Sequence, residues 1–135
     1  MKTSKFCAVP LAAALVIAMV TATAQAAAPA ATLVVLTNAD RGRTVTTAVG
    51  DDVEVRLTGY RERGLTWSWS LPQADSPDVL KRTAGTVTPA GDARAVFHAQ
   101  HLGTGKLTAT RKCRPDPGKV CPLVVMPWKV TVDVK

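Results

Sequence analysis

The sequence has few of the residues that usually carry catalysis. It contains 2 histidines, and aromatic residues make up 4% of its 135 residues. No H-E-x-x-H motif is present, and Ser68, Ser70 and Ser76 do not stand in the strand-to-helix context of a hydrolase nucleophile. His98 alternates with Phe97 in an extended pattern, which is typical of a surface residue on a strand. Because no acid–base or nucleophile pair is in view, we predict a protein that is not an enzyme and that carries no metal and no cofactor.

Long hydrophobic runs are also missing. The apolar run at the N-terminus, Ala8–Val20, has about 13 residues, short of the roughly 18–20 that a bilayer span needs. Lys2 and Lys5 precede it, and Ala24-Gln25-Ala26 follows it as an A-x-A cleavage site. We therefore predict a secretory signal peptide over residues 1–26 and one mature domain over residues 27–135. The mature domain would be a monomer secreted to the periplasm or the medium, with no membrane span.

Cysteine is scarce as well, with 3 in the chain. Cys7 would leave with the signal peptide, so Cys113 and Cys121 remain in the mature domain. An exported pair at this spacing is typical of a disulfide. A metal site is the alternative, but no histidine stands near the pair and two thiolates alone make a poor zinc site. We predict a Cys113–Cys121 bridge that holds one loop in a fixed shape.

No long stretch shows a helical period, and apolar residues alternate at a spacing of two instead. Five runs carry this pattern: Val53–Leu57, Trp67–Leu71, Ala95–Ala99, Leu107–Thr110 and Val130–Val134. Clusters of Pro, Gly, Asn and Asp separate them, as turns require. The pattern predicts an all-β, immunoglobulin-like antiparallel β-sandwich of seven or eight strands, with a small β-barrel as the alternative.

Two tryptophans and one proline lead to further expectations about this sandwich. Trp67 alternates with Trp69, so we expect Trp67 to pack between the two sheets. Pro127 would place its part of the last strand at an edge or a bulge, because proline cannot donate a ladder hydrogen bond.

Three connections of such a sandwich are expected to meet at one end. With the strands lettered A to G, the BC loop is Thr58–Leu65, the DE loop is about Thr88–Ala93 and the FG loop is Cys113–Pro122. The charged BC stretch "GYRERGLTW" would then lie beside the disulfide-bridged FG loop.

Several motifs together resemble the chagasin-type inhibitors of papain-like cysteine peptidases. "LTNADRGRTVTTAVGDDVEVRL" is similar to the opening of that family, with its G-x-T-V and V-G-D elements. "RGLTW" stands where the family has its N-P-T-T-G-Y-x-W loop, and "PAGDARAVFHA" where it has a glycine-rich loop and an F-x-F-x-A strand. "LGTGKLTATRKCRP" resembles the strand that leads into an R-P-W loop, and "WKVTVDV" resembles the closing strand. The resemblance runs from Leu36 to the C-terminus.

The resemblance implies a function as well as a fold. Members of this family are immunoglobulin-like sandwiches that block the cleft of a papain-like cysteine peptidase reversibly, with the BC, DE and FG loops as a non-covalent wedge. Carried onto this sequence, it implies one protein partner, the peptidase, and a set of target-binding residues. These residues are Arg61, Glu62, Arg63, Gly64, Leu65, Gly91, Asp92, Arg114, Pro115 and Asp116.

The sequence departs from the family in all three loops. In the DE loop the family's glycines are reduced to Gly91, which is followed by Asp92. Tyr60-Arg61-Glu62-Arg63 replaces the small N-P-T-T stretch, and Asp116 replaces the tryptophan of R-P-W. Burying the charges of the BC loop without partners would be costly. Without the tryptophan, the interface with the peptidase would lose an aromatic anchor. An ion pair of Arg61 or Arg63 with Asp116 would neutralise the wedge.

These departures support an alternative of a different class. Basic residues outnumber acidic ones by 17 to 10, and several fall in the BC and FG loops. The domain could be a non-inhibitory immunoglobulin-like recognition or adhesion module that binds an acidic envelope polymer or protein through its arginine-rich end. A solvated surface without a partner is the simpler interpretation of the same charges. We predict no nucleic-acid partner, because the basic residues are not interleaved with exposed aromatics.

Overall fold

The computed structural model describes residues 13–24 and 30–135, and residues 13–24 have no secondary structure. The predicted signal peptide and its cleavage site lie largely outside the described residues, so the signal peptide and the start of the mature domain stay predictions. Within the described part, no helix has the length and apolar character needed to cross a membrane.

The described residues form an all-β structure, as the alternation predicts. They contain eleven strands and one short 3-10 helix, and no α-helix. The elements are β1 (Leu33–Thr37), η1 (Asn38–Asp40), β2 (Thr44–Thr47), β3 (Asp52–Leu57), β4 (Tyr60–Glu62), β5 (Leu65–Trp69), β6 (Gln73–Ala74), β7 (Leu80–Val87), β8 (Ala93–Ala99), β9 (Gly103–Ala109), β10 (Arg111–Pro115) and β11 (Trp128–Val134). The predicted count of seven or eight strands is wrong, because short strands such as β4 and β10 form within the segments expected to be loops.

Two four-stranded sheets carry most of the fold. Their strand orders are β1-β3-β8-β7 and β2-β11-β9-β6. The expectation of purely antiparallel sheets is wrong, since β1 runs parallel to β3 and β2 runs parallel to β11. The cause lies at η1, where the first extended segment is interrupted. Its two halves, β1 and β2, join different sheets, each at an edge.

The core comes from alternate residues of the central strands. β3, β8, β9 and β11 bury every second side chain, which places the predicted alternating runs as expected. The largest buried side chain is Trp128, which is 1% exposed and donates from Nε1 to the Thr37 carbonyl at 3.0 Å. Pro127 precedes β11 and lies in no strand, so the prediction that this proline stands within the last strand, at an edge or a bulge, is wrong.

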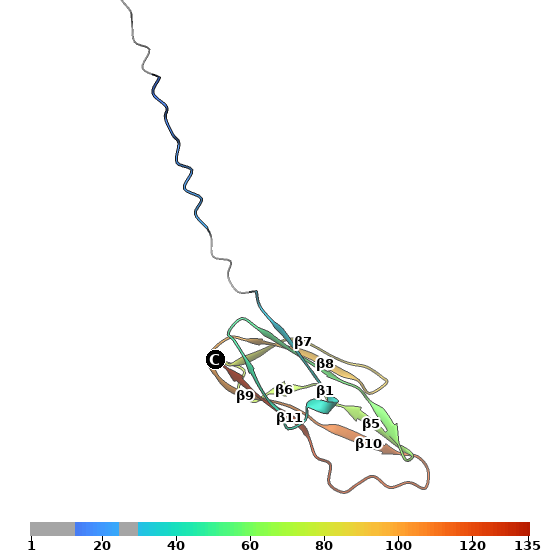
Figure 1. Cartoon of the computed structure of the whole chain (residues 1–135). Coiled ribbons are helices and arrows are strands. Elements are labelled where there is room, and N and C mark those ends of the chain that lie inside the picture. The colour runs from blue at the N-terminus through green and yellow to red at the C-terminus, as the bar shows by residue number, and fades with distance from the viewer. Residues whose placement is uncertain (1–12, 25–29) are drawn as a thin grey trace, which may run out of the picture.

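A third sheet of three strands, β10-β5-β4, extends from one end of the fold. In Figure 1 the C-terminus lies at the left end of the domain, whereas β5 and β10 lie at the right end. After β10 the chain turns at that end and returns along the lower edge of the view to β11. We call the three-stranded sheet, together with the β7–β8 connection and the segment after β10, the loop end.

Candidate functional site

The BC stretch is a β-hairpin. β4 pairs with β5 from Tyr60↔Trp67 to Glu62↔Leu65. The two residues between them, Arg63 and Gly64, both have positive φ, at 52° and 76°. Two such residues form the kind of turn that fits the twist of paired strands, so the flanking chain stays extended. The prediction of a loop over Thr58–Leu65 is therefore wrong for Tyr60–Glu62 and Leu65, whereas Thr58, Gly59 and the two tip residues lie outside the strands.

The first part of the FG stretch is also a strand. β10 pairs with the other edge of β5, from Arg111↔Trp69 to Pro115↔Leu65. Arg114 and Pro115 are therefore strand residues and not loop residues, which corrects their predicted place. Pro115 can stand there because it is the last residue of an edge strand. Asp116 then begins a turn, and its N–H donates to the Gly64 carbonyl at 2.9 Å.

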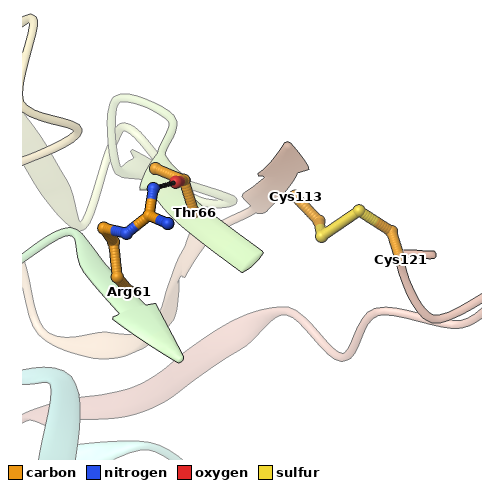
Figure 2. Close-up of a disulfide and its surroundings, with 4 residues drawn as sticks. All are labelled: Arg61, Thr66, Cys113 and Cys121. Atoms are coloured by element: carbon orange, nitrogen blue, oxygen red, sulfur yellow. Dashed lines mark hydrogen bonds between the residues drawn. A yellow bond between two sulfur atoms is a disulfide. The ribbon is translucent and has the colours of Figure 1, made fainter. Parts of the chain in front are cut away.

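Arg61 and Asp116 form the ion pair that would neutralise the hairpin. Arg61 Nη2 lies 2.6 Å from Asp116 Oδ2, and Arg61 Nη1 donates to Thr66 Oγ1 at 2.7 Å. Figure 2 shows Arg61 reaching across to Thr66 on the neighbouring strand. Both partners stay well exposed, at 60% and 42% of their side chains, so solvent screens the pair. The pair orders the two segments more than it stabilises the fold.

The DE connection is attached to the hairpin from the side. The Trp69 N–H donates to the Gly91 carbonyl at 2.9 Å, and the Gly59 N–H donates to Asp92 Oδ1 at 2.7 Å. Gly91 is buried with φ 91°, and a Cβ there would lie 2.9 Å from Ser68 Cβ. Among the predicted contact residues, Gly91 and Asp92 thus hold the connection in place, whereas Thr88, Pro89 and Ala90 are its exposed residues.

These attachments create a hollow between the DE connection and one face of the three-stranded sheet. Its volume is about 320 Å³, and its lining includes Thr66, Ser68, Ala90, Lys112 and Arg114. Lys112 and Arg114 are exposed, so this face is cationic. Of the predicted site residues, the structure brings Arg61, Gly91 and Arg114 to this face, while Glu62, Arg63, Gly64 and Leu65 form the projecting tip of the hairpin.

Trp67 is buried, but it does not pack between the two large sheets. It is 5% exposed and lies outside the main core cluster. Tyr60 stacks on one part of it with ring centroids 6.2 Å apart, and the Arg111 guanidinium carbon lies 4.5 Å from its ring centroid. The expected place between the sheets is therefore wrong. Trp67 instead forms a small cation–π cluster inside the loop end.

The predicted disulfide between Cys113 and Cys121 is present, as Figure 2 shows, with the two Cα atoms 6.0 Å apart. It anchors the chain after β10 to the three-stranded sheet. Cys121 lies within an apolar segment, Val120–Met126, which we call the apolar arm. The sequence patterns did not single out this segment. Leu123 in the arm is 101% exposed, and Val120 and Val124 are 84% and 78% exposed. The uncharged run "VCPLVVMP" could have revealed it, but a rule that loops are polar hides such a segment.

Ionisable groups at the loop end make no cluster that suggests catalysis or metal binding. Within residues 13–24 and 30–135, no group of three or more His, Cys, Asp or Glu side chains could hold a metal ion. His98 Nδ1 lies 2.8 Å from Asp52 Oδ1, on the β3–β8 pair and away from the hairpin. What the loop end offers is a surface with a charged tip, a cationic hollow and an apolar arm.

A solved structure of a known protein shares this fold. The chain resembles the crystal structure of the cysteine protease inhibitor EhICP2 from Entamoeba histolytica with a TM-score of 0.54 and 14% identity, over 80% of this chain and 100% of that one. This likeness matches, at the level of the fold, the resemblance to chagasin-type inhibitors found in the sequence.

Two further structures are less similar. The solution structure of amebosin has a TM-score of 0.45 and 17% identity, over 78% of this chain and 99% of that one. The crystal structure of an inclusion body protein from Burkholderia cenocepacia has a TM-score of 0.46 and 14% identity, over 68% of this chain and 59% of that one. Because both TM-scores are below 0.5, neither likeness supports a conclusion about this chain. No protein-family model matches the sequence, and no curated protein matches it significantly.

Proposed function

We propose that the protein is a secreted inhibitor of papain-like cysteine peptidases, not an enzyme, and that it blocks the active-site cleft reversibly with its loop end. The observation that carries this proposal is that the hairpin, the DE connection and the segment after β10 are joined to one another. Asp92 accepts a hydrogen bond from the Gly59 N–H, and the Gly64 carbonyl accepts one from the Asp116 N–H. The Asp116 carboxylate in turn pairs with Arg61. A surface that is ordered before binding loses little conformational entropy on binding, which favours tight inhibition. The fold shared with a cysteine protease inhibitor supports the same proposal.

The charged tip is compatible with entry into a cleft. Arg61 is already paired with Asp116, so burying the pair costs less free energy than burying a lone guanidinium. Glu62 and Arg63 lie at the end of the hairpin and would stay solvated at the rim of the cleft or meet charges of the peptidase. The apolar arm, with Leu123 wholly exposed, supplies the apolar contact that the family places on its R-P-W tryptophan.

A titration against a papain-like peptidase of known active-site concentration tests the proposal. We expect activity to fall to zero at one equivalent of the mature protein and to return on dilution. Arg63→Glu should weaken inhibition by about tenfold, since a reversed charge at a rim lowers the association rate and the affinity. Lys81→Glu, the same change on the exposed surface of β7, is the matched control and should inhibit like the wild type. Full peptidase activity at micromolar protein would contradict the proposal.

A second candidate function is recognition of an acidic partner without inhibition. The observation that favours it is the cationic hollow, where Lys112 and Arg114 face the DE connection and neither side chain has an ion-pair partner among the described residues. Capture of an acidic polymer such as polyglutamate should then weaken with salt and fail in a Lys112→Glu, Arg114→Glu variant. Capture by that variant at wild-type strength would exclude this function.

A further inference from the structure

The three-stranded sheet has a second hollow, on the face opposite the cationic one. Residues directly paired across strands share a face, so Trp69 and Arg111 lie on one side of the sheet, whereas Ser68 and Lys112 lie on the other. The second hollow, which we call the indole hollow, has a volume of about 260 Å³. Its lining includes Asn38, Arg41, Tyr60, Trp69, Arg111 and Met126.

Two arginines line the indole hollow, Arg41 and Arg111, and neither forms an ion pair with a carboxylate among the described residues. Arg111 donates from Nη1 to the Tyr60 hydroxyl and lies over the Trp67 ring, while its Nε is buried with no hydrogen-bond partner in the described part of the chain. Within the described part of the chain, the groups that contact its guanidinium are a phenol and an indole face. No acidic residue among those described lines this hollow. The Asp40 carboxylate, next to Arg41 in the sequence, accepts from the Thr37 N–H and pairs with Arg43.

The walls of the indole hollow are held by hydrogen bonds to the backbone. Trp69 donates from Nε1 to the Thr58 carbonyl at 3.0 Å. The Asn38 side chain both donates to the Thr58 carbonyl and accepts from the Thr58 N–H, at 2.9 and 2.8 Å. These bonds fix the position of the Trp69 ring. Rigid walls lower the entropic cost of holding a ligand.

The chemistry of these walls selects a ligand class. Arginine binds planar oxyanions such as carboxylate and phosphate with paired N–H donors. The Trp69 ring offers a flat apolar surface, and the Met126 side chain can adapt to the shape that lies against it. At about 260 Å³ the hollow is slightly smaller than the roughly 300 Å³ at which common ligand pockets begin, so it suits a small ligand with a single ring.

We propose that the indole hollow is a binding site for a small organic anion, with its oxyanion group held by Arg41 and Arg111 and its flat apolar body against Trp69. The site lies on the other face of the sheet from the cationic hollow. It uses none of the charged residues Arg61, Arg63, Lys112 or Arg114, so it can be tested separately from the proposed inhibition, and it shares only Met126 with the apolar arm.

The test is an NMR titration of the ¹⁵N-labelled mature protein with four probes. Benzoate and phenyl phosphate carry both a ring and an oxyanion, inorganic phosphate lacks the ring, and benzyl alcohol lacks the charge. We expect the two ring-bearing anions to shift the Trp69 indole signal and the Asn38 and Arg41 amides, and to leave Ser68 and Gly91 unchanged. The comparison of benzoate with phenyl phosphate assigns the preferred oxyanion. Inorganic phosphate and benzyl alcohol should bind at least about tenfold more weakly, since each loses one half of the contacts.

Variants make the test specific to the two guanidinium groups. Arg41→Gln lies on the surface and should lower the affinity for the better anion by about tenfold without changing the fold. Arg111→Lys keeps the charge and removes the planar fork, and should lower affinity at least as much. Lys112→Gln, one residue away on the opposite face, is the matched control and should bind as the wild type does.

Three results would overturn the proposal. One is the absence of saturable shifts with either ring-bearing anion at millimolar concentration. Another is wild-type affinity in Arg41→Gln, which also keeps the test decisive if Arg111→Lys fails to fold. The third is binding of inorganic phosphate as tight as that of phenyl phosphate, because it would remove the role of the Trp69 ring.

Discussion

The two large sheets and the loop end are stabilised by different interactions. In the large sheets, side chains that alternate along β3, β8, β9 and β11 meet in one apolar core. The three-stranded sheet is centred on the cation–π cluster of Trp67, Tyr60 and Arg111, and its order comes from a disulfide, an ion pair and hydrogen bonds to backbone groups. The core therefore accounts for resistance to unfolding, whereas the loop end is built to present a surface.

The largest effect should come from the core. Phe97 on β8 is 0% exposed, and Phe97→Ala removes a ring from the centre of the sandwich. We expect a loss of about 3–5 kcal/mol in the free energy of unfolding, measured by urea denaturation. Leu65→Ala, a truncation of a half-buried residue at the loop end, should cost about 1 kcal/mol. Equal losses at the two positions would show that the loop end is part of the same core.

Removal of the disulfide should have the second-largest effect on stability. The bridge closes a loop with a sequence separation of 8, for which chain entropy gives about 2–3 kcal/mol. A Cys113→Ser, Cys121→Ser variant should lose that amount and should exchange amide hydrogens faster in β10 than in β8. If exchange accelerates equally in both strands, the loop end does not open separately from the core. Mass measurement of the exported protein should also find no free thiol at either position.

Gly59 tests how closely the hairpin and the DE connection are joined. A Cβ at Gly59 would lie 2.7 Å from the Ala90 carbonyl oxygen and 2.9 Å from the Gly91 carbonyl carbon, both backbone atoms that cannot rotate away. Gly59→Ala should cost about 1–3 kcal/mol and weaken inhibition, because the two segments must separate. Thr58→Ala at the exposed neighbouring position is the control and should behave like the wild type in both assays.

The pH dependence of stability should reside in the large sheets. Glu54 on β3 is 2% exposed, and hydrogen bonds from Arg56 first and Arg94 second lower the pKa of its carboxyl below the ordinary 4.5. Its contribution is therefore complete above pH 4.5 and is lost as the pH falls through the lower pKa of the folded state. Glu54→Gln should cost about 1 kcal/mol at pH 7, because the arginines are half-exposed, and should flatten the fall in stability towards pH 3. An unchanged pH profile in the variant would assign acid sensitivity to other groups.

The smallest change in stability should come from the ion pair at the loop end. Asp116→Asn removes the partner of Arg61 in an exposed pair, so the free energy of unfolding should fall by less than about 1 kcal/mol. Inhibition should nevertheless weaken several-fold, since Arg61 would enter the cleft without its counter-ion. A variant that inhibits as well as the wild type would show that the pair has no part in binding.

The sequence predicted the large sheets better than the loop end for a physical reason. Alternation reports burial on a sheet face, so the strands around Val53, Phe97 and Val132 could be located from it. The hairpin was missed because Arg63 adopts a positive φ that favours glycine or asparagine, and no rule predicts this from the residue type.

Contacts between distant segments account for the remaining differences. The Tyr60–Trp67–Arg111 cluster depends on the register of β10 against β5, which joins residues more than 40 positions apart. Local pattern carries no information on that register. The Cys113–Cys121 bridge could be predicted, because two cysteines in a domain predicted to be secreted leave few choices. The exposed apolar arm is harder to identify from the sequence, because an uncharged run is also typical of a buried strand.

The most direct test of the account is to map the surface that meets a peptidase. The ¹⁵N-labelled mature protein would be mixed with a papain-like peptidase whose catalytic cysteine is replaced by alanine, and amide shifts would be recorded. We predict shifts at the non-proline residues within 61–65, 89–92 and 112–116 and in the apolar arm at Leu123, with β7 and the C-terminus unchanged. Shifts confined to the opposite end of the sandwich, or no complex at micromolar concentrations, would contradict the claim that the loop end is the inhibitory surface.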